Sequence, residues 1–386
     1  MKLLLRILAA IALGIGAGYV MPDWAARIFT TFNGIFAQFL GFLIPLLILG
    51  YVAPAIAEIG SKAGRMLLAT ALIAYAMTLA SGWFSFGVGA WLFPMLIEAE
   101  APIAALEPGA GESGTLTAYF SVDMPPLFGV MTALVLAFVL GLGMAYSGAT
   151  ALKRGFDEFR HIISRTISRV IIPLLPVYIF GIFMAMTIEG RVGRVMMTFI
   201  SIVAIIFAIH VVLLLAQFAI AGLAARRNPL AMLRTMLPAY VTALGTQSSA
   251  ATIPVTLRQV KALGVGESTA GFVVPLCATI HMSGSALKIT ACALALMIMQ
   301  GMPWGVGEFA GFIAMLGITI IAAPGVPGGA IMAALGLLTS MLGFSEADNA
   351  LMIALYITMD SFGTACNVTG DGAIAVIVER IFARRG

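Results

Sequence analysis

Four polar side chains follow one another at helical spacing in the last apolar segment of the chain. Asp360, Thr364, Asn367 and Asp371 are separated by four, three and four residues, so an α-helix places them on one face. A carboxylate in an apolar span costs roughly 3 kcal/mol unless it faces a cavity or meets a cation. The only other charge expected at this depth is Lys288, and one lysine cannot neutralise two carboxylates. The pattern therefore predicts a functional face that meets cations rather than a structural ion pair.

A second polar interruption lies upstream, in the apolar segment Phe272–Met299. The stretch His281–Ser285 breaks this segment with serine and glycine, which permit a helix to unwind. Unwound backbone carbonyl groups are natural ligands for a hard alkali cation. The sequence therefore predicts that this break helps to bind a cation.

Two further segments share one construction, an apolar arm, a tip of small residues and proline, and a second apolar arm. Residues 230–257 carry the tip Gln247–Pro254, and residues 311–342 carry the tip Ala322–Gly329. Each arm is too short to cross a bilayer alone, and irregular backbone is not tolerated in contact with lipid. Paired broken segments in two halves of a chain point to the binding site of a transporter. We therefore predict two re-entrant hairpins rather than two helices kinked by proline.

The composition indicates the elements that must position these residues. The chain has 386 residues, of which 61% are hydrophobic and 10% charged, with a mean hydropathy of +1.07; a typical soluble domain is about 25% charged. Only a bilayer accepts so much apolar surface, which excludes a soluble enzyme. Runs long enough to cross it are Leu3–Val20, Phe29–Ala57, Met66–Phe93, Leu127–Tyr146, Val170–Ile188 and Val195–Ala225, followed by Phe272–Met299 and Leu351–Phe382. The prediction is an all-α polytopic membrane protein with eight transmembrane helices and two re-entrant hairpins.

The distribution of charge predicts the topology. With the N-terminus in the cytoplasm, 17 of the 21 Lys and Arg residues fall on the inner side, and the exceptions are Arg27, Arg191, Arg194 and Lys288. This agrees with the positive-inside rule and predicts that both termini are cytoplasmic in a plasma or inner membrane. The net charge of +4 therefore does not indicate nucleic acid. The first run is taken as a retained span, because no cleavage site of small residues with a soluble sequel follows it. The three cysteines lie in apolar context and predict no disulfide framework.

At the hairpin tips and the last helix the sequence resembles the dicarboxylate/amino acid:cation symporter family, which contains sodium-coupled glutamate and neutral amino acid transporters. The tip Ser248–Pro254, the tip Gly325–Gly328 and the run Asn367–Asp371 match its signatures in order and spacing. The resemblance is specific from about Thr242 onward. It implies a homotrimer in the lipid bilayer, inverted repeats, and a mobile transport domain that moves against a static scaffold like an elevator.

The resemblance also implies domain boundaries. Residues 1–62 would form scaffold spans one and two, 63–96 span three of the transport domain, and 97–190 an outer loop with scaffold spans four and five. Residues 191–386 would form the rest of the transport domain. This part contains span six, a first hairpin at about 230–258, span seven, a second hairpin at about 304–345, and span eight.

The resemblance implies where the small-molecule substrate binds. Asp360 matches the aspartate that binds the substrate's amino group, and Thr364 and Asn367 match polar substrate contacts. Ser249 belongs to the tip that holds the substrate's α-carboxylate. The other substrate positions implied are Gln247, Ser248, Ser285, Val326, Pro327, Gly328 and Gly363.

The expected substrate class follows from a missing arginine. Members that carry acidic substrates place an arginine where this chain has Gly363, or at the first tip where it has Gln247. Without either arginine, a second substrate carboxylate would lose its water and gain no partner. A small neutral amino acid such as serine, threonine or alanine is expected, and the pattern from Asp360 to Asn367 looks like the serine/threonine branch.

The sodium sites are also carried over from the resemblance. Asp371, Asn367 and carbonyl groups near Cys277 and His281 match a first site, which is intact. A second site would use carbonyl groups at Thr279, Ile320, Ile321 and Ala323.

A third site of the family would need an asparagine and an aspartate in the broken segment, with a tyrosine and a threonine from span three. Tyr75 and Thr78 are present, but His281 and Ser283 replace the asparagine and the aspartate. Loss of the carboxylate weakens this site, so two sodium ions are expected rather than three. His281 has two readings, a proton carrier and a neutral imidazole that fills the vacated space.

Rival functions also remain at this stage. An intramembrane aspartyl hydrolase needs two carboxylates about 3 Å apart, whereas Asp360 and Asp371 are separated by about 16 Å of helical rise, unless the helix is broken between them. A channel is less easily excluded, although paired hairpin gates favour alternating access. The nearest alternative is a proton-coupled carrier of a dicarboxylate or another carboxylate on the same fold. An unpaired Asp360 would repel such a substrate, which argues against this alternative.

Overall fold

The computed structural model describes residues 2–61, 64–97, 116–190, 192–321, 323 and 328–382. Within these residues the chain is helical and contains no strand. The helices are α1 (Lys2–Val20), α2 (Asp23–Ser61), α3 (Arg65–Leu96), α4 (Val130–Ser147), α5 (Thr150–Thr166), α6 (Ile172–Ile188), α7 (Val192–Ala225), α8 (Pro229–Thr246), α9 (Ser249–Ala262), α10 (Glu267–Ile280), α11 (Ser283–Met299), α12 (Val306–Ile321), α13 (Gly329–Leu342), α14 (Glu346–Thr358) and α15 (Asp360–Phe382).

In the described part of the chain, eight helices or continuous helix pairs are long and apolar enough to cross a membrane. Two of them are pairs: α5 continues into α6 through a short π-helical turn at Ile167–Ile171, and α10 is followed closely by α11. Two shorter apolar helices, α12 and α13, are too short for this purpose. The prediction of an all-helical polytopic membrane protein is confirmed.

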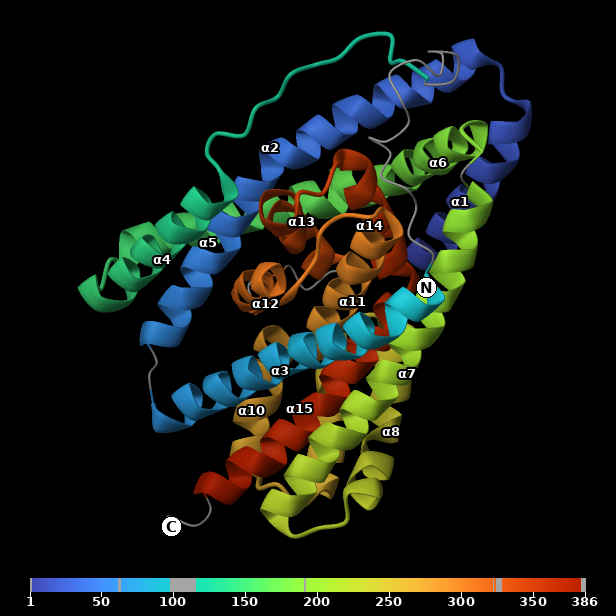
Figure 1. The fold of residues 1–386 in the computed structure, drawn as a ribbon. Coiled ribbons are helices and arrows are strands. Elements are labelled where there is room, and N and C mark those ends of the chain that lie inside the picture. The colour runs from blue at the N-terminus through green and yellow to red at the C-terminus, as the bar shows by residue number, and fades with distance from the viewer. Residues whose placement is uncertain are drawn as a thin grey trace.

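The helices pack in two groups. Helices α1, α2, α4, α5 and α6 contact one another, and α3, α7, α8, α9, α10, α11 and α15 form a second set of mutual contacts. Figure 1 shows α2, α4, α5 and α6 along one side of the molecule and α3, α7, α8, α10 and α15 along the other, with α11 to α14 between them. The short helices therefore lie where the two groups meet.

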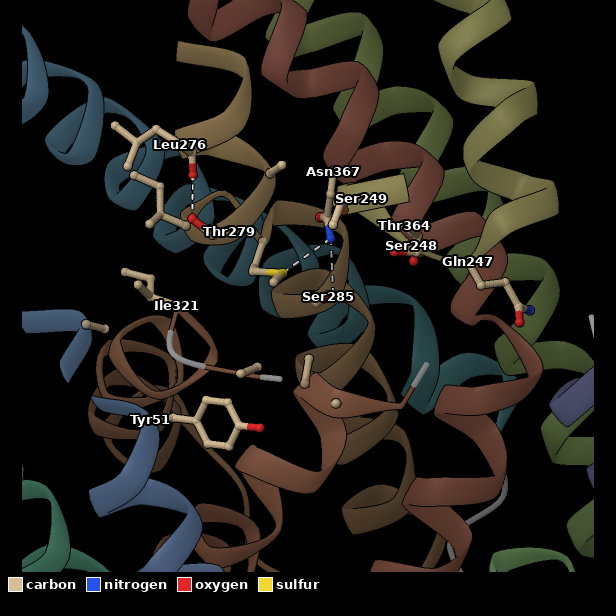
Figure 2. A pocket seen from close by; sticks show the side chains of 18 of the residues that line it. Tyr51, Gln247, Ser248, Ser249, Leu276, Thr279, Ser285, Ile321, Thr364 and Asn367 are labelled. Atoms are coloured by element: carbon tan, nitrogen blue, oxygen red, sulfur yellow. Dashed lines mark hydrogen bonds between the residues drawn. The ribbon is translucent and has the colours of Figure 1, made fainter. Parts of the chain in front are cut away.

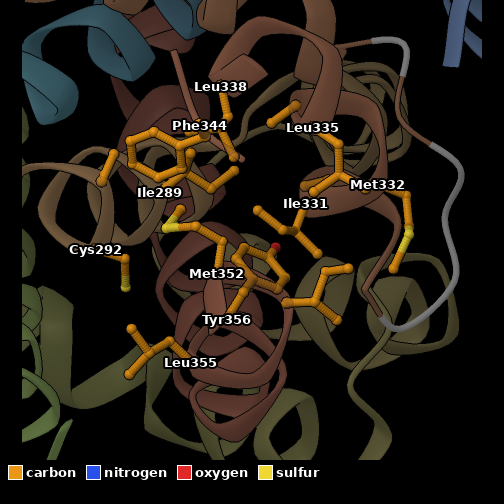
Figure 3. Packing of buried hydrophobic residues seen from close by; sticks show 14 of the residues in the cluster. Ile289, Cys292, Ile331, Met332, Leu335, Leu338, Phe344, Met352, Leu355 and Tyr356 are labelled. Atoms are coloured by element: carbon orange, nitrogen blue, oxygen red, sulfur yellow. The ribbon is translucent and has the colours of Figure 1, made fainter. Parts of the chain in front are cut away.

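The distribution of apolar residues around each helix decides which helices are buried in the core. Every residue of α11 is buried, because this helix carries mostly apolar residues on every face, as expected of a helix enclosed by other helices. Figure 3 shows part of the adjoining core, where Ile289 and Cys292 of α11 lie near Ile331 and Leu335 of α13 and Tyr356 of α14. By contrast, large apolar side chains on α1, α3, α4 and α7 are exposed, as lipid-facing surfaces require.

Two predicted segments differ from the structure in their boundaries. The last apolar segment is not one helix, because the backbone is interrupted at Met359 and α15 begins at Asp360. The first tip is narrower than predicted: only Gln247 and Ser248 interrupt the helices, and Ser249–Pro254 belongs to α9. In the second tip, Ala322 and residues 324–327 lie outside the described residues.

Candidate functional site

A cavity of about 400 Å³ lies where the short helices meet. Figure 2 shows Ser248 before α9, Ser249 of α9, Ser285 of α11, and Thr364 and Asn367 of α15 around it. The residues that line it are Tyr51, Ala55, Leu67, Arg160, Gln247, Ser248, Ser249, Ala250, Phe272, Leu276, Ala278, Thr279, Ile280, Met282, Ser285, Ile321, Ala323, Gly329, Ala330, Tyr356, Asp360, Thr364 and Asn367. The polar faces predicted from four distant segments therefore meet at one place.

Three helices begin at this cavity. Ser249, Gly329 and Asp360 are the first residues of α9, α13 and α15, and all three line the cavity. The first backbone N–H groups of a helix have no partner within it, and the helix dipole adds partial positive charge there. These ends together favour an anionic group such as a carboxylate.

The first tip is formed by an unusual backbone conformation. Gln247 ends α8 with φ of 53°, the left-handed region that non-glycine residues seldom adopt, and its side-chain amide donates to Ser361 Oγ at 2.7 Å. Ser248 then caps α9, with its Oγ accepting from the Ala251 amide at 3.3 Å. The predicted substrate residues Gln247, Ser248 and Ser249 are thus placed beside the start of α15. The predicted residues Val326 and Pro327 lie outside the described residues.

Asn367 ties α15 to the break between α10 and α11. Its Oδ1 accepts from the Gly284 amide at 2.7 Å, and its Nδ2 donates to Ser285 Oγ at 3.3 Å. Helices α11 and α15 approach each other closely here. A Cβ on Gly284 of α11 would lie only 2.5 Å from the carbonyl oxygen of Gly363 in α15. The break was predicted at His281–Ser285, and it occupies only His281 and Met282.

Asp360 has a partner on each carboxylate oxygen. Its Oδ1 is 3.2 Å from the Lys288 ammonium, and its Oδ2 accepts from the Gly328 amide at 2.9 Å. Gly328 directly precedes α13, so this bond joins the pair of helices α12 and α13 to α15. The expectation of an unpaired Asp360 is therefore wrong.

Lys288 also occupies the space beside Gly363. A Cβ on Gly363 would lie 2.5 Å from Lys288 Nζ and would meet Cε as well. The sequence interpretation took this place to be without a cation, because no arginine is present. That premise is wrong, since α11 supplies an ammonium group where α15 lacks a guanidinium.

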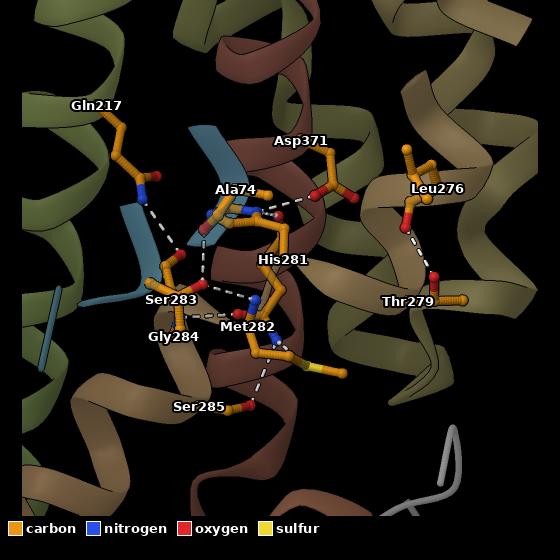
Figure 4. Close-up of polar contacts among 12 residues, drawn as sticks. Ala74, Gln217, Leu276, Thr279, His281, Met282, Ser283, Gly284, Ser285 and Asp371 are labelled. Carbon is orange, nitrogen blue, oxygen red and sulfur yellow. Dashed lines mark hydrogen bonds and ion pairs between the residues drawn. The ribbon is translucent and has the colours of Figure 1, made fainter. Parts of the chain in front are cut away.

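Asp371, the second predicted carboxylate, meets His281 instead of a lysine. His281 Nδ1 lies 2.9 Å from Asp371 Oδ1 and 3.2 Å from the Asn367 carbonyl oxygen. The opposite ring nitrogen, Nε2, is buried without a hydrogen-bond partner, and so is Gln217 Oε1. Figure 4 shows this cluster around the break, with Gln217 reaching Ser283. The imidazole thus contacts two oxygen-bearing residues that the resemblance gives to the first sodium.

The other predicted cation residues are distributed in two places. Thr279, Ile321 and Ala323 line the cavity, as the second site would require. Ile320 is buried in the same helix, and its carbonyl oxygen accepts from the Ala323 amide at 3.0 Å. Cys277 is fully buried, and its carbonyl oxygen accepts a hydrogen bond from the His281 amide at 2.9 Å.

The residues of the third predicted site are only partly together. Thr78 Oγ1 accepts from the Met282 amide at 3.2 Å, next to Ser283. The Tyr75 hydroxyl instead donates to the Ala314 carbonyl oxygen on α12 at 3.2 Å. Among the described residues, no group of three or more His, Cys, Asp or Glu side chains could hold a metal, so a cation bound at Asp371 would also need carbonyl or hydroxyl oxygens.

Several lining residues were not found by sequence reasoning, and they include Arg160, Tyr356 and Tyr51. Tyr356 lines the cavity, its hydroxyl lies 3.1 Å from Ser285 Oγ, and its ring lies 3.6 Å from Lys288 Nζ. Its position four residues before Asp360 extends the polar spacing and could have revealed it. Tyr51 of α2 lines the cavity from the other helix group, and no local pattern marks it.

Two comparisons with known proteins indicate the class of protein. A family model described as the sodium:dicarboxylate symporter family matches residues 3–381. The serine/threonine transporter SstT of Acinetobacter baumannii is 26% identical to this chain, over 98% of the chain and 96% of that protein. Both are transporters, so the chain is not expected to be an enzyme.

Proposed function

We propose that this chain, which belongs to the sodium:dicarboxylate symporter family, carries a small amino acid across the membrane together with sodium. The observation that supports this most directly is the cavity that brings the starts of α9, α13 and α15 together with Asp360. Helix N-termini favour the α-carboxylate of an amino acid, and a carboxylate side chain favours its ammonium group. The cavity therefore offers a partner for each end of a zwitterion, and Asp360 also pairs with Lys288 there.

A small neutral amino acid such as serine, threonine or alanine is the first candidate. The similarity to a protein named as a serine/threonine transporter supports it. Thr364 and the Ser248–Ser249 tip offer hydroxyl groups of the kind that a serine or threonine side chain can meet.

A proton-coupled carrier of a dicarboxylate or another carboxylate is a second candidate. The salt bridge between Lys288 and Asp360 favours it, because a neutralised aspartate no longer repels an anionic substrate. The buried pair of His281 and Asp371 offers ionisable groups that could carry a proton.

The transport step is proposed to be an elevator movement. The separation into two contact groups supports a scaffold of α1, α2, α4, α5 and α6 and a transport domain of the remaining helices. The pairs α8–α9 and α12–α13 would be the re-entrant hairpins, with their tips at the cavity. A homotrimer with cytoplasmic termini in the plasma membrane completes the proposal.

Binding titration on the purified protein tests this function. The proposal expects serine, threonine or alanine to bind with sodium present and to lose most affinity when choline replaces sodium. Binding that is equal in sodium and choline, and that changes with pH, would favour the second candidate. An absence of binding for the neutral amino acids and for simple carboxylates would overturn both.

A further inference from the structure

The lysine behind the cavity is held as an amino acid's ammonium group would be held. Lys288 Nζ lies 3.2 Å from Asp360 Oδ1, 3.4 Å from the Met359 carbonyl oxygen and 3.6 Å from the centre of the Tyr356 ring. A carboxylate, a carbonyl oxygen and an aromatic face are the partners that bind a primary ammonium. The ammonium-binding place in this pocket is therefore already filled by the chain itself.

Burial makes this arrangement specific. Lys288 is fully buried and Asp360 is 5% exposed, and such residues are almost never buried unless they are paired. Asp360 nevertheless lines the cavity, so the carboxylate that binds the internal ammonium and the Gly328 amide is also within reach of a solute. An exposed pair, such as Lys261 with Glu267, has no such relation to a cavity.

A substrate's ammonium gains its advantage from a carboxylate that lacks a cation. Here the carboxylate has one, and a second ammonium on Asp360 would lie close to the first. Like charges at such distances oppose each other, so an incoming ammonium must either displace Lys288 or share the carboxylate with it. A hydroxyl group at the same position meets neither difficulty, because it is neutral and can donate to Asp360.

We propose that Lys288 competes with the substrate's ammonium for Asp360, so that the carrier discriminates weakly between a small amino acid and the hydroxy acid of the same shape. The substrate class is then small α-substituted carboxylates, with an amino or a hydroxyl group on the α-carbon. This inference rests on the proposed transport function, and it adds that Lys288 sets the range of substrates that the pocket accepts.

The test compares matched ligands on the purified full-length protein in sodium. Serine is titrated against glycerate, and alanine against lactate, with the parent protein and with Lys288→Met. The parent should prefer the amino acid by less than about tenfold, which corresponds to about 1.4 kcal/mol. In Lys288→Met, Asp360 lacks its cation, so the amino acid should bind more tightly, the hydroxy acid more weakly, and their ratio should widen by about tenfold or more.

Lys261→Met is the matched control, because it removes a lysine from the exposed pair and should leave the ratio unchanged. Lys288→Arg retains a cation and should retain the weak discrimination; if Lys288→Met does not fold, Lys288→Gln removes the charge while keeping a donor for Asp360.

A parent that prefers serine over glycerate by more than about tenfold overturns the inference alone and leaves sodium-coupled amino acid transport in place. An unchanged ratio in a folded Lys288→Met does the same. If none of the four ligands binds in sodium, the proposed function fails and the inference fails with it.

Discussion

The contact between α11 and α15 can be tested with a series of three glycines. A Cβ on Gly284 would lie 2.5 Å from the Gly363 carbonyl oxygen and 2.8 Å from Cys366 Cβ. Backbone atoms cannot move aside as a flexible side chain can, so Gly284→Ala must push the two helices apart by roughly 1 Å. Overpacking of this kind costs about 1–3 kcal/mol, and more in rigid places. The shift would also break the 2.7 Å bond between the Gly284 amide and Asn367.

Gly363→Ala should lower the free energy of unfolding less than Gly284→Ala does. The added Cβ meets the end of Lys288, which can move, but only by leaving Asp360. Gly271→Ala is the control, because a Cβ there meets nothing within 4 Å and alanine favours a helix by about 0.5–1 kcal/mol over glycine.

The assay for this series is the thermal unfolding midpoint of each purified variant in detergent, followed by substrate titration in sodium. The unfolding midpoint should be highest for Gly271→Ala, lower for Gly363→Ala and lowest for Gly284→Ala. Substrate binding should be weakened most in Gly284→Ala. If Gly284→Ala unfolds at the same temperature as Gly271→Ala and binds substrate as the parent does, the close approach of α11 and α15 is refuted.

Three further substitutions address the charged groups. Asp371→Asn removes the carboxylate of the first proposed sodium site, so substrate affinity should lose its dependence on sodium while the protein still folds; unchanged dependence in a titration with sodium and choline would show that the site is misplaced. Asp360→Asn removes a charge-assisted contact worth roughly 1.5–3 kcal/mol and should weaken an amino acid more than its deaminated analogue, whereas an equal loss would rule out the amino-group role. His281→Asn removes the imidazole from Asp371 and the Asn367 carbonyl and should lower the sodium concentration for half-maximal binding; a higher value would show that the imidazole assists the cation.

The sequence predicted the class of the fold because its signals are local. Apolar runs of membrane length identify spans, and the clusters of proline and small residues mark the ends of α8 and α12 where their partners begin. The break at His281 was visible for the same reason. The break at Met359 was not, since neither glycine nor proline marks it and the flanking residues read as one helix. It matters for the site, because it makes Asp360 the first residue of α15.

The partners of the charged residues could not be predicted from the sequence. Asp360 and Lys288 are 72 residues apart, and His281 and Asp371 are 90 apart, so their pairing depends on how α11 and α15 pack. The premise that no cation lies beside Gly363 is wrong for this reason. The missing arginine on α15 predicted that a second substrate carboxylate would find no partner, whereas α11 places the Lys288 ammonium beside Gly363, which no spacing along the chain reveals.

The measurement that tests the central claim most directly is uptake into proteoliposomes that contain the purified protein. An inward sodium gradient should drive accumulation of labelled serine, threonine or alanine above equilibrium, and the accumulation should disappear when choline replaces sodium or when Asp371→Asn is reconstituted. Equilibration without accumulation in the presence of the gradient, in liposomes shown to be sealed, would contradict cation-coupled transport by this chain.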